Sequence, residues 1–212
     1  MFGIHDLPLF ILAGLLLNIT PGPDMLYIAG RTASQGFRSG LAAVMGINAG
    51  CLVHTLAGAI GFSAILMASA EAFLVVKLVG AAYLVYVGIS LLLEKQKAAP
   101  EISSSLPSKT TRQAFWQGFL TNVLNPKIAL FFLALLPQFI STESNAKPAA
   151  FVALGIIFIF NSLFITIGFA AIVARARTRF QGAPRIALWL NRSCGALFIA
   201  IGVKLALTEK PI

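Results

Sequence analysis

The sequence has 212 residues, of which 58% are hydrophobic and only 11% are charged. That charged fraction is less than half of the roughly 25% usual in soluble globular domains, so the chain cannot cover itself with polar surface. The net charge of +9 and the mean hydropathy of +0.88 therefore exclude an ordinary soluble domain and predict membrane-spanning helices of about 20 apolar residues each.

Six apolar stretches of that length follow one another along the chain. They leave no room for a soluble domain, because the longest connection is short and rich in Ser, Pro and Lys. The first stretch is longer than a signal-peptide core and has no basic region before it, so we expect it to be retained. The predicted spans are Leu7–Ile28, Leu41–Ala68, Ala72–Leu93, Ala114–Ile140, Ala149–Ala174 and Ile186–Leu207.

The first span is interrupted near its middle by Asn18, Pro21, Gly22, Pro23 and Asp24. Proline removes a backbone donor and clashes with the preceding turn, so two prolines around a glycine predict an unwound or kinked helix. The freed backbone groups must then face protein, water or a ligand. A structural kink alone would also explain the prolines. Asp24, however, is the only carboxylate deep within a predicted span, and such residues usually have a partner or a function.

The second span carries His54 near its centre, beside Cys51 and Asn48. Two interpretations are open for His54: it relays a proton or binds substrate, or it is a hydrogen-bonded packing residue. The two cysteines, Cys51 and Cys194, lie in different spans and form no C-x-x-C pair. The sequence therefore predicts no disulfide framework, no metal site and no other cofactor.

The fourth span repeats the interruption of the first, with Asn122, Asn125, Pro126 and Lys127 at its centre. The segment that ends at Lys127 resembles the one that ends at Asp24, and Gly80–Lys95 aligns without a gap on Gly195–Lys210. Chance similarity among Leu-rich and Gly-rich helices is the alternative explanation. A duplicated unit of three spans must enter the membrane in the opposite sense the second time.

The predicted fold is thus an all-α integral membrane protein with six transmembrane helices in two inverted three-helix repeats. The first repeat covers residues 1–95 and the second covers residues 114–212, and residues 96–113 form a cytoplasmic linker. Inverted repeats of this kind are common in transporters, whose substrate site lies near the membrane midplane between broken helices.

Asp24 and Lys127 occupy equivalent positions if Pro23 is matched to Pro126. They could then face each other across the pseudo-twofold axis. We hypothesise that the two side chains pair in one state, and that protonation of Asp24 or arrival of a zwitterionic substrate breaks the pair. A fixed structural ion pair is the alternative.

Basic residues follow the first, third and fifth spans and are sparse in the other connections. Positive-inside bias places these three connections in the cytoplasm and both termini outside. The same distribution suits attraction to membrane lipid and argues against nucleic-acid binding. The residues are Arg31, Arg38, Lys95, Lys97, Lys109, Arg112, Arg175, Arg177, Arg179 and Arg185.

Four motifs together resemble the LysE/RhtB family of amino-acid exporters, and the resemblance covers nearly the whole chain. They are Pro21–Leu26, Gly36–Ala43 with His54 further along the same span, Lys77–Leu84, and Gly118–Lys127. The resemblance implies a bacterial inner-membrane protein that exports amino acids or related small metabolites, with the proton gradient as its expected driving force.

The predicted substrate and proton pathway comprises Asn18, Pro21, Gly22, Pro23, Asp24, His54, Asn122, Asn125, Pro126 and Lys127. A membrane-embedded enzyme and a channel-like subunit are the competing functions. The enzyme lacks support because the sequence has no H-E-x-x-H helix, no G-x-S-x-G elbow and no paired intramembrane aspartates. The expected partners are an amino acid, membrane lipid and, from glycine pairs such as Gly46 and Gly50, a possible homodimer.

Overall fold

A computed structural model describes residues 2–68, 70–93, 110–141 and 143–175, together with single residues and pairs between 192 and 207. This part of the chain is helical, which confirms the all-α class. The elements are α1 (Leu7–Ile19), α2 (Pro23–Gln35), α3 (Phe37–Ala68), α4 (Ala70–Leu93), α5 (Thr111–Val123), α6 (Pro126–Leu130), the π-helical η1 (Phe131–Leu135), the 3₁₀ turn η2 (Leu136–Phe139) and α7 (Lys147–Arg175).

The described residues hold two to four candidate membrane spans. The Phe37–Gly61 part of α3 and the whole of α7 are long and apolar enough to cross alone, and two bent helix pairs qualify if each pair counts as one span. The third predicted span is helical as α4. The sixth span, Cys194, most of the linker and the Arg177–Arg185 cluster lie outside the described residues. Six spans in an inverted repeat therefore stay a prediction.

Both predicted interruptions are present in the structure. α1 and α2 meet at an angle of 50°, and α5 meets the α6–η2 segment at 48°. In each pair the second helix begins with a proline, Pro23 or Pro126, at its first position, where no helical partner for an N–H exists. The second bent pair is more irregular than the sequence indicated, because η1 and η2 replace regular helix before and around Pro137.

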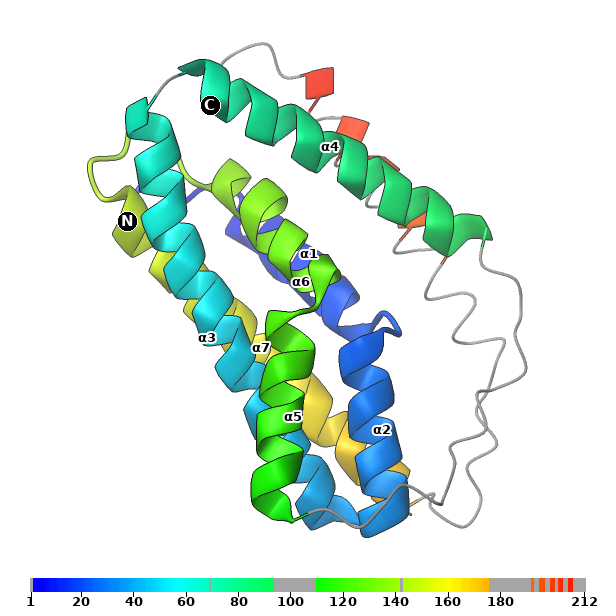
Figure 1. Ribbon diagram of the computed structural model, residues 1–212. Helices are drawn as coiled ribbons and strands as arrows, with labels where there is room; N and C mark the ends of the chain where they lie inside the picture. The colour runs from blue at the N-terminus through cyan, green and yellow to red at the C-terminus, as the bar shows by residue number, and fades with distance from the viewer. Residues whose placement is uncertain are drawn as a thin grey trace.

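α3 packs closely along α5 through glycines on both helices (Figure 1). A Cβ atom at Gly50 would lie 2.8 Å from the Asn122 Cβ and 3.0 Å from the Phe119 oxygen, and one at Gly118 would lie 2.6 Å from the Ala43 oxygen. Small residues let membrane helices approach in this way. Gly46 and Gly50, the glycine pair of α3, therefore allow close packing of α3 on α5 within the chain.

Phenylalanine side chains fill the region where α1, the second bent pair and α7 meet. Phe10 of α1, Phe131 and Phe139 of the second bent pair and Phe158 of α7 are buried, and Phe131 and Phe158 have ring centroids 4.9 Å apart. The N-terminal segment is hydrogen-bonded to the chain just after η2, where the Ser141 amide donates to the Gly3 oxygen at 2.8 Å.

The described helix ends carry more basic residues at one end of the bundle than at the other, where Lys147 begins α7. The C-terminal ends of α2 and α7 and the N-terminal end of α5 lie together at one end of the bundle, while the N-terminus and the connection between η2 and α7 lie at the other (Figure 1). Arg38, Arg112 and Arg175 belong to the first group, since they lie at or beside these three helix ends.

Candidate functional site

The first break leaves backbone carbonyls without helical donors because two prolines follow them in the sequence. In a continuous helix each carbonyl accepts from the N–H four residues later. Pro21 and Pro23 have no N–H, so Leu17 and Ile19 lose their helical donors. α1 accordingly ends at Ile19, and Thr20 turns into extended backbone with φ −62° and ψ 124°.

Lys127 contacts these carbonyls from the second bent pair. Its ammonium group donates to the Leu17 oxygen at 3.1 Å and to the Thr20 oxygen at 3.1 Å. A cation is favourable there because the C-terminal end of a helix carries partial negative charge. Gly22 lies against the same ammonium, since a Cβ at this position would be 3.2 Å from Nζ.

The second break repeats the pattern with a different side chain. Pro126 removes the helical donor of the Asn122 carbonyl, which instead accepts from His54 Nε2 at 3.0 Å and from the Asn125 amide at 2.9 Å. Asn125 caps α6, its Oδ1 accepting from the Lys127 amide at 3.0 Å. His54 therefore supplies the Asn122 carbonyl with a donor in place of the N–H that Pro126 lacks. A role of His54 in proton relay stays a prediction.

Asp24 and Lys127 make reciprocal contacts between the two bent pairs. Each is the second residue of the helix that follows a break, as the alignment predicted. Asp24 Oδ2 accepts from Asn122 Nδ2 of α5 at 2.8 Å, while Lys127 of α6 reaches the end of α1. Since each side chain has these partners here, their pairing with each other in another state stays a prediction.

At the two helix breaks, four buried polar atoms make no hydrogen bond of good geometry among the described residues, although the Asn125 amide lies near the Asp24 carboxylate. Two are donors, Asn18 Nδ2 and Asn125 Nδ2, and two are acceptors, Asp24 Oδ1 and Asn122 Oδ1. Leaving such an atom unpaired costs about 1–3 kcal/mol, so unpaired buried groups need an explanation. The donors suit a carboxylate and the acceptors suit an ammonium group.

A second polar region between α2 and α5 was not expected. The Tyr27 hydroxyl donates to the Ala114 oxygen at 2.9 Å, and Arg31, only 3% exposed, donates to Gln117 Oε1 at 3.2 Å. The assignment of Arg31 to a basic connection was wrong, because α2 continues to Gln35. The spacing of Asp24, Tyr27 and Arg31, which puts them on one helix face, was the signal that could have revealed this.

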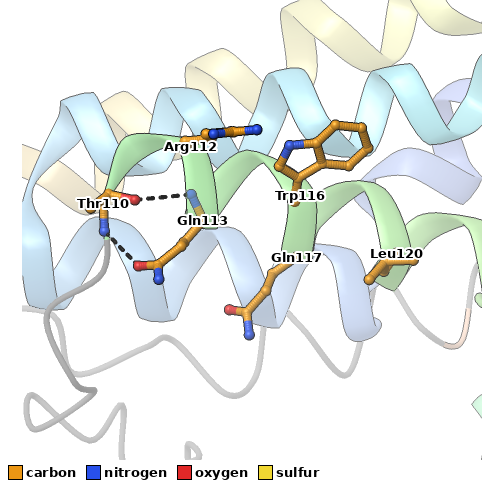
Figure 2. Close-up of a pocket in the computed structure, with 6 residues that line it drawn as sticks. All are labelled: Thr110, Arg112, Gln113, Trp116, Gln117 and Leu120. Carbon is orange, nitrogen blue, oxygen red and sulfur yellow. Dashed lines mark hydrogen bonds between the residues drawn. The ribbon is translucent and has the colours of Figure 1, made fainter.

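A surface hollow lies elsewhere, along the first turns of α5. Figure 2 shows its lining residues on one side of the helix and the capping box between Thr110 and Gln113. The hollow contains none of the predicted pathway residues and shares only Gln117 with the α2–α5 contacts. It is lined by Thr110, Arg112, Gln113, Trp116, Gln117 and Leu120.

In the described part of the chain, no three His, Cys, Asp or Glu side chains gather as metal ligands would. Cys51 is buried in the α3 packing, and the neighbouring Asn48 donates to the Val44 oxygen at 2.9 Å and lies 3.5 Å from Thr166 Oγ1 of α7. This contact joins the two long helices.

Comparison with known proteins agrees with these features. Residues 15–209 match the family of LysE type translocators. A membrane protein of unspecified activity from Vibrio cholerae is 30% identical over 205 residues, covering 96% of this chain and 97% of its own. The homoserine/homoserine lactone efflux protein of Salmonella typhimurium is 28% identical, covering 93% and 94%, and the threonine efflux protein of Salmonella typhi is 26% identical, covering 90% and 92%.

No solved structure matches the chain. The family match extends over both helix breaks and nearly the whole sequence. The chain therefore belongs to the LysE-type translocators, and it is a membrane transport protein rather than a membrane-embedded enzyme.

Proposed function

We propose that this protein exports amino acids, or closely related small metabolites, across the bacterial inner membrane. The observation that carries the proposal is the set of buried, unpartnered donors and acceptors at the two helix breaks. The names of two relatives, which specify efflux of homoserine, homoserine lactone or threonine, support it.

An amino acid matches this set because it presents an ammonium group and a carboxylate a short distance apart. The amides of Asn18 and Asn125 offer donors for the carboxylate, and Asp24 and Asn122 offer acceptors that balance a second ammonium group beside that of Lys127. Burying either charge without a partner would be costly, so a site with both kinds of atom selects a zwitterion. Pro21, Pro23 and Pro126 keep the helices open around this site.

The proposed architecture has six spans in two inverted halves, residues 1–95 and 114–212, joined by the cytoplasmic linker 96–113, with both termini outside. The reciprocal contacts of Asp24 with α5 and of Lys127 with α1 support it, since a pseudo-twofold axis would place each of these two side chains against the opposite half. The grouping of basic helix ends supports the orientation (Figure 1).

Proton antiport is the proposed driving force, with Asp24 as the carrier. Asn122 links Asp24 to His54, because its side chain donates to the carboxylate while its carbonyl accepts from the imidazole. Such linked ionisable groups inside a membrane are typical of proton pathways.

Export is tested by feeding dipeptides that cover each amino acid to cells lacking their own exporters. Cells with the protein are expected to release threonine, homoserine or a similar neutral amino acid faster than cells with the empty vector. A Pro8→Ala variant, altered at an exposed helix start away from the cluster, is the matched positive control. Equal release of every amino acid with and without the protein would rule out the proposed function.

The coupling role is tested by Asp24→Asn in reconstituted vesicles with an imposed pH gradient. Asparagine keeps the size of the side chain but cannot ionise, so we expect proton-driven transport to fall at least tenfold, as for loss of a required proton carrier. Asp6→Asn, at the exposed N-terminal end of α1, should transport normally. Transport by Asp24→Asn that still follows the pH gradient would remove Asp24 from the coupling mechanism.

A further inference from the structure

We propose that the carbonyl oxygens of Leu17 and Thr20 form an ammonium site at the end of α1. Lys127 fills this site in the present structure, and the ammonium group of the transported amino acid displaces it during transport. The second half of this inference rests on the proposed function, whereas the first half rests on the geometry of the break alone.

The site is built by the loss of helical partners. Pro21 cannot donate to Leu17, and the break prevents the Asp24 amide from continuing the helix toward Thr20. Both residues are buried, with 2% and 0% of their surface exposed, so water is a poor substitute. Carbonyls at the ends of broken membrane helices bind cations in this way, and here both lie 3.1 Å from the same nitrogen.

The ammonium group of Lys127 contacts the opposite bent pair. As the second residue of α6 it lies at the positive end of that helix, where a cation gains nothing from the helix dipole. Its long side chain crosses to the negative end of α1, beside Gly22, which leaves space around Nζ. A lysine that makes these contacts through the end of its flexible side chain can exchange partners without moving α6.

Asp24 offers the displaced lysine a second partner. Lys127 is close enough for its charge to act on the Asp24 carboxylate, as the Asn125 side chain also is, and Asp24 Oδ1 makes no hydrogen bond of good geometry among the described residues. Arrival of a substrate ammonium at Leu17 and Thr20 would therefore transfer Lys127 to Asp24. The exchange keeps every buried charge paired, which an unassisted entry of a cation would not do.

The first experiment measures the melting temperature of the purified protein with simple cations. Lys127→Ala empties the site, so 100 mM ethylammonium should raise the melting temperature of this variant by about 2–4 °C. Tetramethylammonium has the same charge but no N–H donor, and it should have no effect. Lys147→Ala, at the start of α7, is the matched lysine control and should not respond to either cation. Equal responses of the two variants would overturn the ammonium site.

The second experiment measures threonine binding. A site already filled by Lys127 weakens the apparent affinity of a competitor, so Lys127→Ala should bind threonine about tenfold more tightly than the unmodified protein. Ethylammonium should compete with threonine, and N-acetylthreonine should not bind. Weaker threonine binding by Lys127→Ala, or no competition, would overturn the displacement step.

The unmodified protein provides the same test without a variant, should Lys127→Ala fail to fold. Ethylammonium should lower its affinity for threonine, and tetramethylammonium should not; equal effects would overturn the inference. If ethylammonium stabilises Lys127→Ala but no amino acid binds or is exported, the ammonium site stands and the proposed function fails, so the two failures are distinguishable.

Discussion

A proline within a membrane helix bends the helix and also leaves the carbonyl four residues earlier without its N–H donor. Here the carbonyls of Leu17 and Asn122 lose their donors to Pro21 and Pro126, and Lys127 and His54 supply replacements. The polar residues of the two breaks are therefore best understood as pairs of a freed backbone group and a side chain from another element.

Asn122 provides a residue-scale prediction. Replacing it with leucine keeps the volume but removes the donor to Asp24, so a buried carboxylate oxygen is left unpaired at a cost of about 1–3 kcal/mol. The melting temperature in detergent should fall by a few degrees. Thr121→Ala, which removes only a hydroxyl bonded to Gln117 of its own helix, is the control and should change stability by less than about 0.5 kcal/mol. Equal effects of the two substitutions would contradict the role of the Asn122 amide.

The sequence identified the polar residues of the breaks but not most of their partners. Asn122, Asp24 and Lys127 were recognisable because amides and charges are rare in apolar spans. That Lys127 would contact Leu17 and Thr20 depends on how α1 and α6 are rotated against each other, which no local pattern encodes. Arg31 was misplaced because polar residues in α2 made the helix look shorter than it is.

Among the elements, α3 holds the bundle together through its glycines. Gly46 and Gly50 lie against α5, and Gly58 and Gly155 let α3 and α7 approach, the latter glycine facing Thr55. The sequence left open whether such glycines join helices within the chain or between two chains. Because these glycines are already covered, the predicted homodimer would need another surface.

Two glycines of α3 give an element-scale prediction with opposite signs. A Cβ at Gly50 would lie 2.8 Å from Asn122 atoms, so Gly50→Ala forces α3 away from α5 and should destabilise the protein by about 1–3 kcal/mol. Gly61 has no atom within 4 Å of its added Cβ, so Gly61→Ala should leave stability unchanged or raise it by up to about 1 kcal/mol. Thermal unfolding checks both, and a loss of stability at Gly61 alone would contradict the helix packing.

Element boundaries followed from apolar length where one helix fills one span. The bounds of α3, α4 and α7 lie within a few residues of the predicted second, third and fifth spans, because each helix follows one continuous apolar stretch of the sequence. The second bent pair was predicted less well. The π segment Phe131–Leu135 and the 3₁₀ turn at Pro137 depend on local competition between backbone partners rather than on hydropathy.

At the scale of the whole molecule, the two ends of the bundle differ in chemistry. The end with the basic helix ends contains the contacts of Tyr27 and Arg31 with α5, whereas the opposite end is packed with rings such as Phe10 and Phe139. Hydrogen bonds can be exchanged for bonds to water at little net cost, but exposing packed aromatic surface is unfavourable. The basic end is thus the easier one to open to water.

This difference matters for direction, because an exporter must admit substrate from the cytoplasm. Positive-inside bias predicts that the basic end, where Arg112 and Arg175 lie, faces the cytoplasm. Single cysteines introduced at opposite ends test the orientation in a protein whose Cys51 and Cys194 are replaced by alanine. Asn145→Cys, exposed between η2 and α7, should react with a membrane-impermeant maleimide in intact spheroplasts. Arg112→Cys, exposed in the first turn of α5, should react only after the membrane is permeabilised. The reverse pattern would place both termini inside and would require substrate to enter through the phenylalanine-packed end.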